Sequence, residues 1–368
     1  MRAILLGLGI LVLGLPAIAQ NMRPVPRPGP DQTAGEPLVI SSKSPTPRPP
    51  YLLEGFEMRL ALSAAGRGEW DLAAGIAAAD SEIAADVIEW LRLRAGVGTF
   101  AEYRAFLAKH PTWPGLGLLR RRGEAAIAEG AAAEQVIAYF ADQPPQSGTG
   151  ALRLAAALAA AGQAGRSRDE LVRAWQTLSM SAEEEAAFLA AHEKVVKPHH
   201  AARLDNALWR EDIAAAKRML PLVGNGWRAL AEARLALQRR AGKVDALIAA
   251  VPANLAQDPG LAYDRMSWQV SKRRREQAAD MILARSTSAE SLGRPESWAN
   301  WRRILARQNM REGNAARAYE LASRHRLTSG SDYADLEWLS GYLALRFLNK
   351  PAEAYAHFQR PDCHKPFW

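Results

Sequence analysis

Residues 313–358 carry the clearest fold signal in this chain and read GNAARAYELASRHRLTSGSDYADLEWLSGYLALRFLNKPAEAYAHF. Apolar residues recur there at the spacing of one helix face, first at Ala315, Ala318, Tyr319 and Ala322, then at Leu336, Leu339, Leu343 and Phe347. Asn349-Lys350-Pro351 ends the second pattern, and Pro351 suits the first turn of a third helix with Ala354, Tyr355 and Phe358 on its apolar side. Three helices joined by short turns predict an α-solenoid.

The same pattern extends upstream and predicts an all-α fold for residues 51–360. The chain is 48% hydrophobic, and alanine is dense in segments where helices must approach closely: 71–79, 152–161, 213–219 and 315–322. Turn residues precede or separate such segments at 66–69, 241–243 and 311–314, and we expect Asn225-Gly226 to lie between helices. The pattern resembles tetratricopeptide hairpins without a strict repeat. It predicts about 18 to 22 helices in a superhelix with a broad concave surface, either U-shaped or ring-forming.

Two separated segments resemble one enzyme family in the same order. One comprises Gly313–Tyr319, His325 and Tyr333–Tyr342. The other places His200, Arg203, Asp205, Leu208 and Trp209 in a His-x-x-Arg-x-Asp-x-x-Leu-Trp pattern, and Trp227–Leu237 is a weaker third match. These segments look like the helical superhelix of the soluble lytic murein transglycosylases, and the similarity covers about residues 51–360.

The resemblance implies a periplasmic protein that acts on the glycan strands of peptidoglycan. In that family the superhelix precedes a catalytic domain, which cleaves between N-acetylmuramic acid and N-acetylglucosamine without water and leaves an anhydro sugar. Its catalytic glutamate lies in a Glu-Ser-x-Phe motif followed by a Gly-Leu-Met-Gln-like segment. Glu290-Ser291 and Glu296-Ser297 share two letters of the motif but lack the Phe, so Glu296 is interpreted as a first-turn acid after Pro295.

Residues 361–368 have no helical periodicity, and we expect them to be an aberrant tail, such as a frameshift would produce, ahead of the family's catalytic domain. The sequence therefore predicts a chain that is catalytically silent, with no catalytic, cofactor-binding or metal-binding residue. The alternative is a non-enzymatic periplasmic scaffold, resembling tetratricopeptide proteins, that binds protein partners through its concave face.

The N-terminus predicts export. Arg2 is followed by an apolar run over residues 3–15 and by Ala17-Ile18-Ala19, which is the pattern of a signal peptide cleaved after residue 19. The run is too short to span a bilayer, so no stable membrane insertion is expected after cleavage. Residues 20–50 are rich in proline and predict an extended linker.

Other residue groups that could carry chemistry favour structural roles. His192, His199 and His200 lack carboxylates or cysteines at metal-ligand spacing, and Cys363 is the only cysteine. Glu183-Glu184-Glu185 fits the first turn of a helix capped by Ser181. Trp298 and Trp301 could stack on sugars, but their spacing is more typical of a core.

The formal charge of +8 does not indicate nucleic acid as a partner. Two clusters carry much of it, Arg120-Arg121-Arg122 and Lys272-Arg273-Arg274-Arg275. Export argues against nucleic-acid binding, and such runs are usually solvated helix faces. The predicted partners are glycan strands, with periplasmic proteins as the second class.

Overall fold

The computed structural model describes residues 55–360, and this part of the chain is helical without any β-strand. The signal sequence and linker predicted over residues 1–50, residues 51–54, and the tail with Cys363 lie outside the described residues. The helices are α1 (Phe56–Gly66), α2 (Trp70–Asp80), α3 (Glu82–Arg94), α4 (Phe100–Lys109), α5 (Leu116–Ala125), α6 (Ala133–Tyr139), α7 (Gly148–Ala160), α8 (Ala164–Thr177), α9 (Ala182–Val196), α10 (His200–Trp209), α11 (Ile213–Met219), α12 (Asn225–Gln238), α13 (Asp245–Ala249), α14 (Pro259–Ser271), α15 (Arg275–Arg285), α16 (Ala289–Leu292), α17 (Pro295–Arg311), α18 (Ala315–Ser323), α19 (Ser331–Arg346) and α20 (Pro351–Phe358). Two 3₁₀ turns, Lys197–His199 and Leu220–Leu222, join α9 to α10 and α11 to α12.

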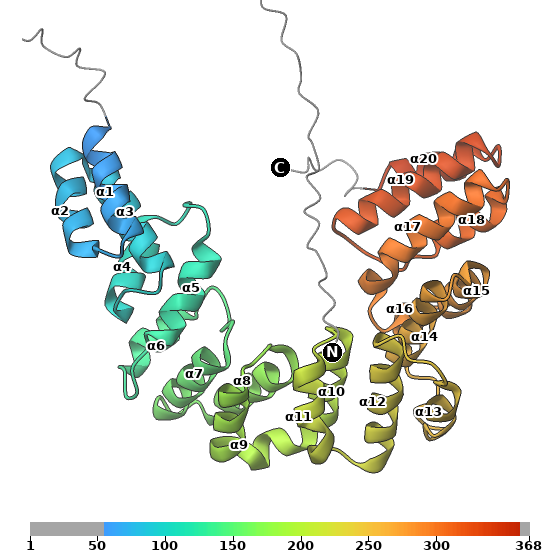
Figure 1. Ribbon diagram of the computed structural model, residues 1–368, viewed down its shortest axis with the longest axis horizontal. Helices are drawn as coiled ribbons and strands as arrows, with labels where there is room; N and C mark the ends of the chain where they lie inside the picture. The colour runs from blue at the N-terminus through green and yellow to red at the C-terminus, as the bar shows by residue number, and fades with distance from the viewer. Residues whose placement is uncertain (1–54, 361–368) are drawn as a thin grey trace, which may run out of the picture. The chain divides into compact units, whose positions relative to one another are not determined.

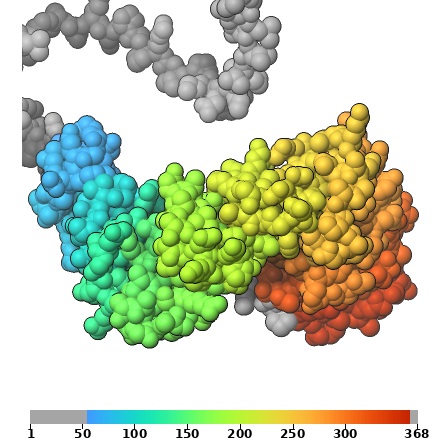
Figure 2. Space-filling model, turned by 90° about the horizontal axis from the view of Figure 1, so that it is seen from below, coloured from blue at the N-terminus to red at the C-terminus, as the bar shows by residue number. Residues whose placement is uncertain are grey.

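Helices that are close in the chain are also the ones that pack together. Extensive contacts join α1 to α2, α7 to α8, α17 to α18 and α19 to α20, and a second set joins helices two places apart, such as α17 and α19. Figure 1 shows the helices following one another in chain order. Side chains fill much of the space between neighbouring ribbons, as the space-filling view shows (Figure 2). The 20 α-helices within residues 55–360 agree with the number expected from the sequence.

Local sequence signals set many helix ends. Ser181 caps α9, as the sequence predicted. The structure adds a capping box, in which the Ser181 side chain accepts from the Glu184 N–H and the Glu184 carboxylate accepts from the Ser181 N–H. Pro351 lies in the first turn of α20, which confirms that prediction as well. The expectation for Asn225-Gly226 was wrong, because both residues lie in the first turn of α12, after Gly224 at the N-cap.

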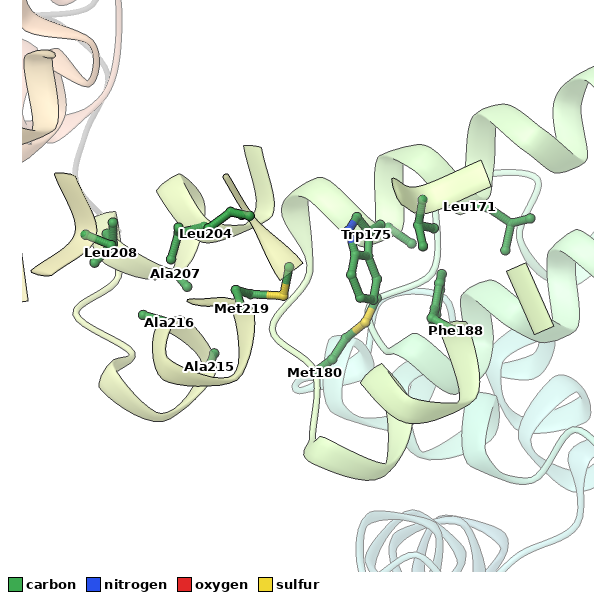
Figure 3. Close-up of a cluster of buried hydrophobic side chains, with 14 of the residues drawn as sticks. Leu171, Trp175, Met180, Phe188, Leu204, Ala207, Leu208, Ala215, Ala216 and Met219 are labelled. Carbon is green, nitrogen blue, oxygen red and sulfur yellow. The ribbon is translucent and has the colours of Figure 1, made fainter. Parts of the chain in front are cut away.

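Alanine allows the helices to approach closely. In the largest buried cluster Ala207 on α10 and Ala215 and Ala216 on α11 are almost fully buried. Figure 3 shows Met180 and Phe188 beside the Trp175 ring, with Leu204 and Met219 in the neighbouring part of the same cluster. Further clusters of this kind follow along the chain, so each group of helices is held by its own apolar contacts.

The last three helices follow the predicted pattern with two corrections. Leu336, Leu339 and Leu343 are buried, but Phe347 is 45% exposed and Tyr355 is 63% exposed. Phe347 caps the C-terminus of α19, so the helical spacing no longer determines the direction of its side chain. Tyr355 is one residue from the buried Ala354, and a rotation of about 100° per residue turns it away from the packed side of α20.

Candidate functional site: an aromatic surface on α19

Three exposed apolar side chains and the half-buried Tyr342 gather along the C-terminal half of α19 and just after it. We call them the α19 aromatic surface: Trp338, Tyr342, Leu345 and Phe347. The Trp338 and Tyr342 rings are stacked, with centroids 5.4 Å apart and planes inclined by 5°. Phe347 meets the Tyr342 ring edge to face at 5.8 Å. Trp338 is 54% exposed and Leu345 53% exposed, so these are not core residues. Exposed apolar groups that cluster in this way mark interaction sites.

The helical repeat explains why these residues gather. Positions 338, 342 and 345 are separated by four and three residues, so they share one side of α19, while Leu336, Leu339 and Leu343 occupy the buried side. One turn before Trp338, Asp335 accepts a hydrogen bond of 2.9 Å from Arg303 on α17. Arg346, at the other end, is exposed. The surface therefore offers flat aromatic rings between charged hydrogen-bonding groups.

A buried carboxylate on the packed side of α19 fixes the helix. Glu337 is fully buried, and its carboxylate accepts from His325 at 2.8 Å and contacts His357 at 2.5 Å, with Arg360 as a third partner. The Leu327 N–H donates to Nδ1 of His325, so Nε2 of that ring carries the hydrogen donated to Glu337. Tyr319 on α18 joins the network through a 3.0 Å contact with Nε2 of His357. These contacts tie α18, α19 and α20 together.

The electrostatics of this network favour an ionised Glu337. Burial raises the pKa of its carboxyl, but the hydrogen bonds from His325, His357 and Arg360 outweigh burial and lower the pKa to about 2. The aromatic rings thus project from a helix whose buried side is held by charge-assisted hydrogen bonds.

The second resembling segment packs between helices. His200 and Arg203 on α10 lie against the Trp175 ring, and Arg203 donates to Glu185 at 2.6 Å. Within the third match, Arg234 on α12 is fully buried between carboxylates. It donates to Asp205 and to Asp264, both at 2.7 Å. Burial raises the pKa of Asp264 to about 6 despite the neighbouring Arg234 charge.

The other residues considered from sequence are scattered over the helices. Trp298 is fully buried, which confirms its core role, and Trp301 packs against the same cluster. Glu296 lies in the first turn of α17 as predicted, and Glu290 lies in the first turn of the four-residue α16. No group of three His, Cys, Asp or Glu side chains between residues 55 and 360 could hold a metal ion.

The histidines and the charge clusters also lie apart from the α19 aromatic surface. Nδ1 of His199 is 2.8 Å from Gln176, and His192 lies at a kink in α9. Residues 272–275 are exposed as predicted, but residues 272–274 form the turn between α14 and α15, and only Arg275 lies on a helix, as the first residue of α15. Residues 120–122 lie on α5, where the second and third arginines are exposed. Trp338 and Tyr342 were not among the candidate residues predicted from the sequence.

Comparison with protein-family models, curated proteins and solved structures finds no match to this chain. The resemblance to the lytic murein transglycosylases therefore stays a prediction from the residues quoted above. None of the helices between residues 55 and 360 is both long and apolar enough to cross a membrane.

Proposed function

We propose that this protein is an exported helical-repeat protein that binds the glycan strands of peptidoglycan in the periplasm. Its helices would form a superhelix like that of the soluble lytic murein transglycosylases. The observation that carries the proposal is the stacked pair of the exposed Trp338 and the half-buried Tyr342, which lies on the helix where the resemblance is strongest. Packing between helices that are close in the chain supports the superhelix, because repeat proteins are built from such contacts.

The chemistry of the α19 aromatic surface suits a sugar polymer. The faces of a pyranose ring expose C–H groups, which can pack on a flat aromatic ring, while the hydroxyls at the ring edge need hydrogen-bonding partners. Trp338 and Tyr342 supply the ring faces, and Asp335 and Arg346 lie at about one helical turn on either side. The proposed role is binding, and we assign no catalytic role to the described residues.

Retention on purified sacculi tests this function. We expect Trp338→Ala to weaken binding about tenfold, since an aromatic contact is worth about 1 kcal/mol beyond the area that it buries, and Tyr342→Ala to weaken it several-fold. Phe56→Ala is the matched control, because Phe56 is a similarly exposed aromatic residue on α1. Sedimentation of each variant shows whether self-association has changed. Equal retention of the wild-type chain and Trp338→Ala would disprove the proposal.

The presence of Leu345 and Phe347 beside the stacked pair favours one second candidate, a scaffold that binds a periplasmic protein. Aliphatic and edge-on aromatic groups suit a protein interface better than a sugar. A chain that is not retained on sacculi, but captures one defined periplasmic protein in a Trp338-dependent way, would establish this candidate in place of glycan binding.

A further inference from the structure

A cavity of about 370 Å³ lies between α5, α7 and α9, remote in the chain from the α19 aromatic surface. Six of its lining residues matter here: Leu118, Arg121, Arg122, Ser147, Thr149 and Glu184. Its volume is at the lower end of the range for small-molecule sites. The cavity contains both positive and negative side chains, so its binding preference depends on which of them already have partners.

The carboxylates at this cavity are already engaged. Glu184 accepts from the Thr149 N–H at 2.9 Å and from the Ser181 N–H at 3.0 Å. Glu124, buried beside the cavity, accepts from the Gln146 and Ser147 N–H groups, both at 2.8 Å. These bonds hold the loop before α7 and the first turn of α9 in place. These N–H donors occupy hydrogen-bonding positions on both carboxylates, but the carboxylates keep their negative charge, and the charge of Glu124 interacts with that of Arg121.

The guanidinium groups have no such partners. The side chains of Arg121 and Arg122 make no hydrogen bond or ion pair with the part of the chain that the structure describes, and both residues line the cavity. The Arg122 guanidinium also lies next to Gly96, in the turn after α3. A guanidinium presents two parallel N–H donors that match a carboxylate. Leu118 is partly exposed next to them. The cavity thus places guanidinium groups that lack hydrogen-bond partners beside an apolar wall, which suits an anion carried on a carbon skeleton.

We propose that this cavity binds a carboxylate group of a short peptide. The proposal deepens the proposed function and rests on it, because the peptides attached to peptidoglycan glycan strands carry free carboxylates. A protein that holds the sugar chain at α19 and a peptide carboxylate at Arg121 and Arg122 would contact both components of the wall. Peptide binding would then depend on ionic strength, and sugar stacking would not.

Calorimetric titration of the full chain with a synthetic tripeptide, Ala-γ-D-Glu-Lys, tests the cavity. We expect the double variant R121Q/R122Q to bind at least tenfold more weakly than the wild-type chain. The control R307Q/R311Q removes the same charge from exposed positions on α17 and should bind within twofold of wild type. The peptide with amidated carboxyl groups should not bind.

Three outcomes would overturn the proposal: unchanged affinity of R121Q/R122Q, equal affinity for the amidated peptide, or stronger binding of inorganic phosphate than of the peptide. Sacculi stripped of their peptides separate this result from the proposed function. On stripped sacculi, a loss of retention in Trp338→Ala but not in R121Q/R122Q reports on glycan binding. Titration with the free peptide reports only on the cavity.

Discussion

Replacing Glu337 by Gln should destabilise the last three helices in a pH-dependent way. Glu337 is fully buried and accepts from His325, His357 and Arg360, so the substitution leaves three donors facing an uncharged amide. Removing one member of a buried ion pair typically costs about 3–5 kcal/mol. The pKa of the carboxyl gives an independent measure of the same contribution.

That pKa falls from 4.5 to about 2 in the folded protein. At about 1.4 kcal/mol for each tenfold change in proton affinity, the ionised form contributes about 3 kcal/mol to stability. Because the folded pKa lies below the unfolded one, this contribution is fully present above about pH 5 and is lost as the pH falls toward 2. About half of it should remain at pH 3.

Hydrogen exchange of peptides from α18, α19 and α20 measures the opening free energy of this region. The difference between the wild-type chain and Glu337→Gln should be about 3 kcal/mol at pH 6 and should shrink by about half at pH 3. Glu320→Gln is the control, because its exposed pair with Arg324 on α18 is worth about 0.5 kcal/mol or less. A difference that is the same at both pH values, or no larger than that of the control, would refute the reasoning.

Two further predictions concern packing and are checked by urea unfolding. Gly260→Ala should destabilise the protein by about 1–3 kcal/mol, because a Cβ there would overlap the buried Arg234 guanidinium. Gly75→Ala should instead stabilise α2 by about 0.5–1 kcal/mol, because Gly75 has open space around it. Trp298→Ala should cost about 3–5 kcal/mol, since that ring is fully buried, and Trp338→Ala should change stability by less than about 1 kcal/mol. Equal effects within either pair would contradict the packing described here.

The helices were predictable because their signals are local. Helical periodicity, the Ser181 cap and Pro351 at a helix start each depend on a few consecutive residues. The same local rule placed Phe347 and Tyr355 on apolar faces and was wrong for both. Phe347 lies at the helix end, and Tyr355 lies on a short helix whose packed side is narrow.

The candidate site was only partly accessible from sequence. Trp338 follows Leu336 by two residues, an offset of about 200° on a helix, so its position away from the leucine side could have been noticed. The Glu337 network could not be predicted in the same way. His357 is 20 residues away and reaches the carboxylate only because α20 packs against α19. Whether an arginine has an ionic partner is likewise a property of the folded chain.

The packing of helices against their near neighbours in the chain also affects how the molecule folds and unfolds. The described polar contacts between side chains span at most 88 residues, and the extensive helix contacts join much closer segments. A chain with such a low contact order closes only small loops, which favours rapid folding from several starting points. In the repeat array proposed above, heating should then melt the helices in stages and not in one transition, because such arrays lose cooperativity along their length. A destabilising substitution in one group of helices would then leave distant groups folded and still able to bind their ligands.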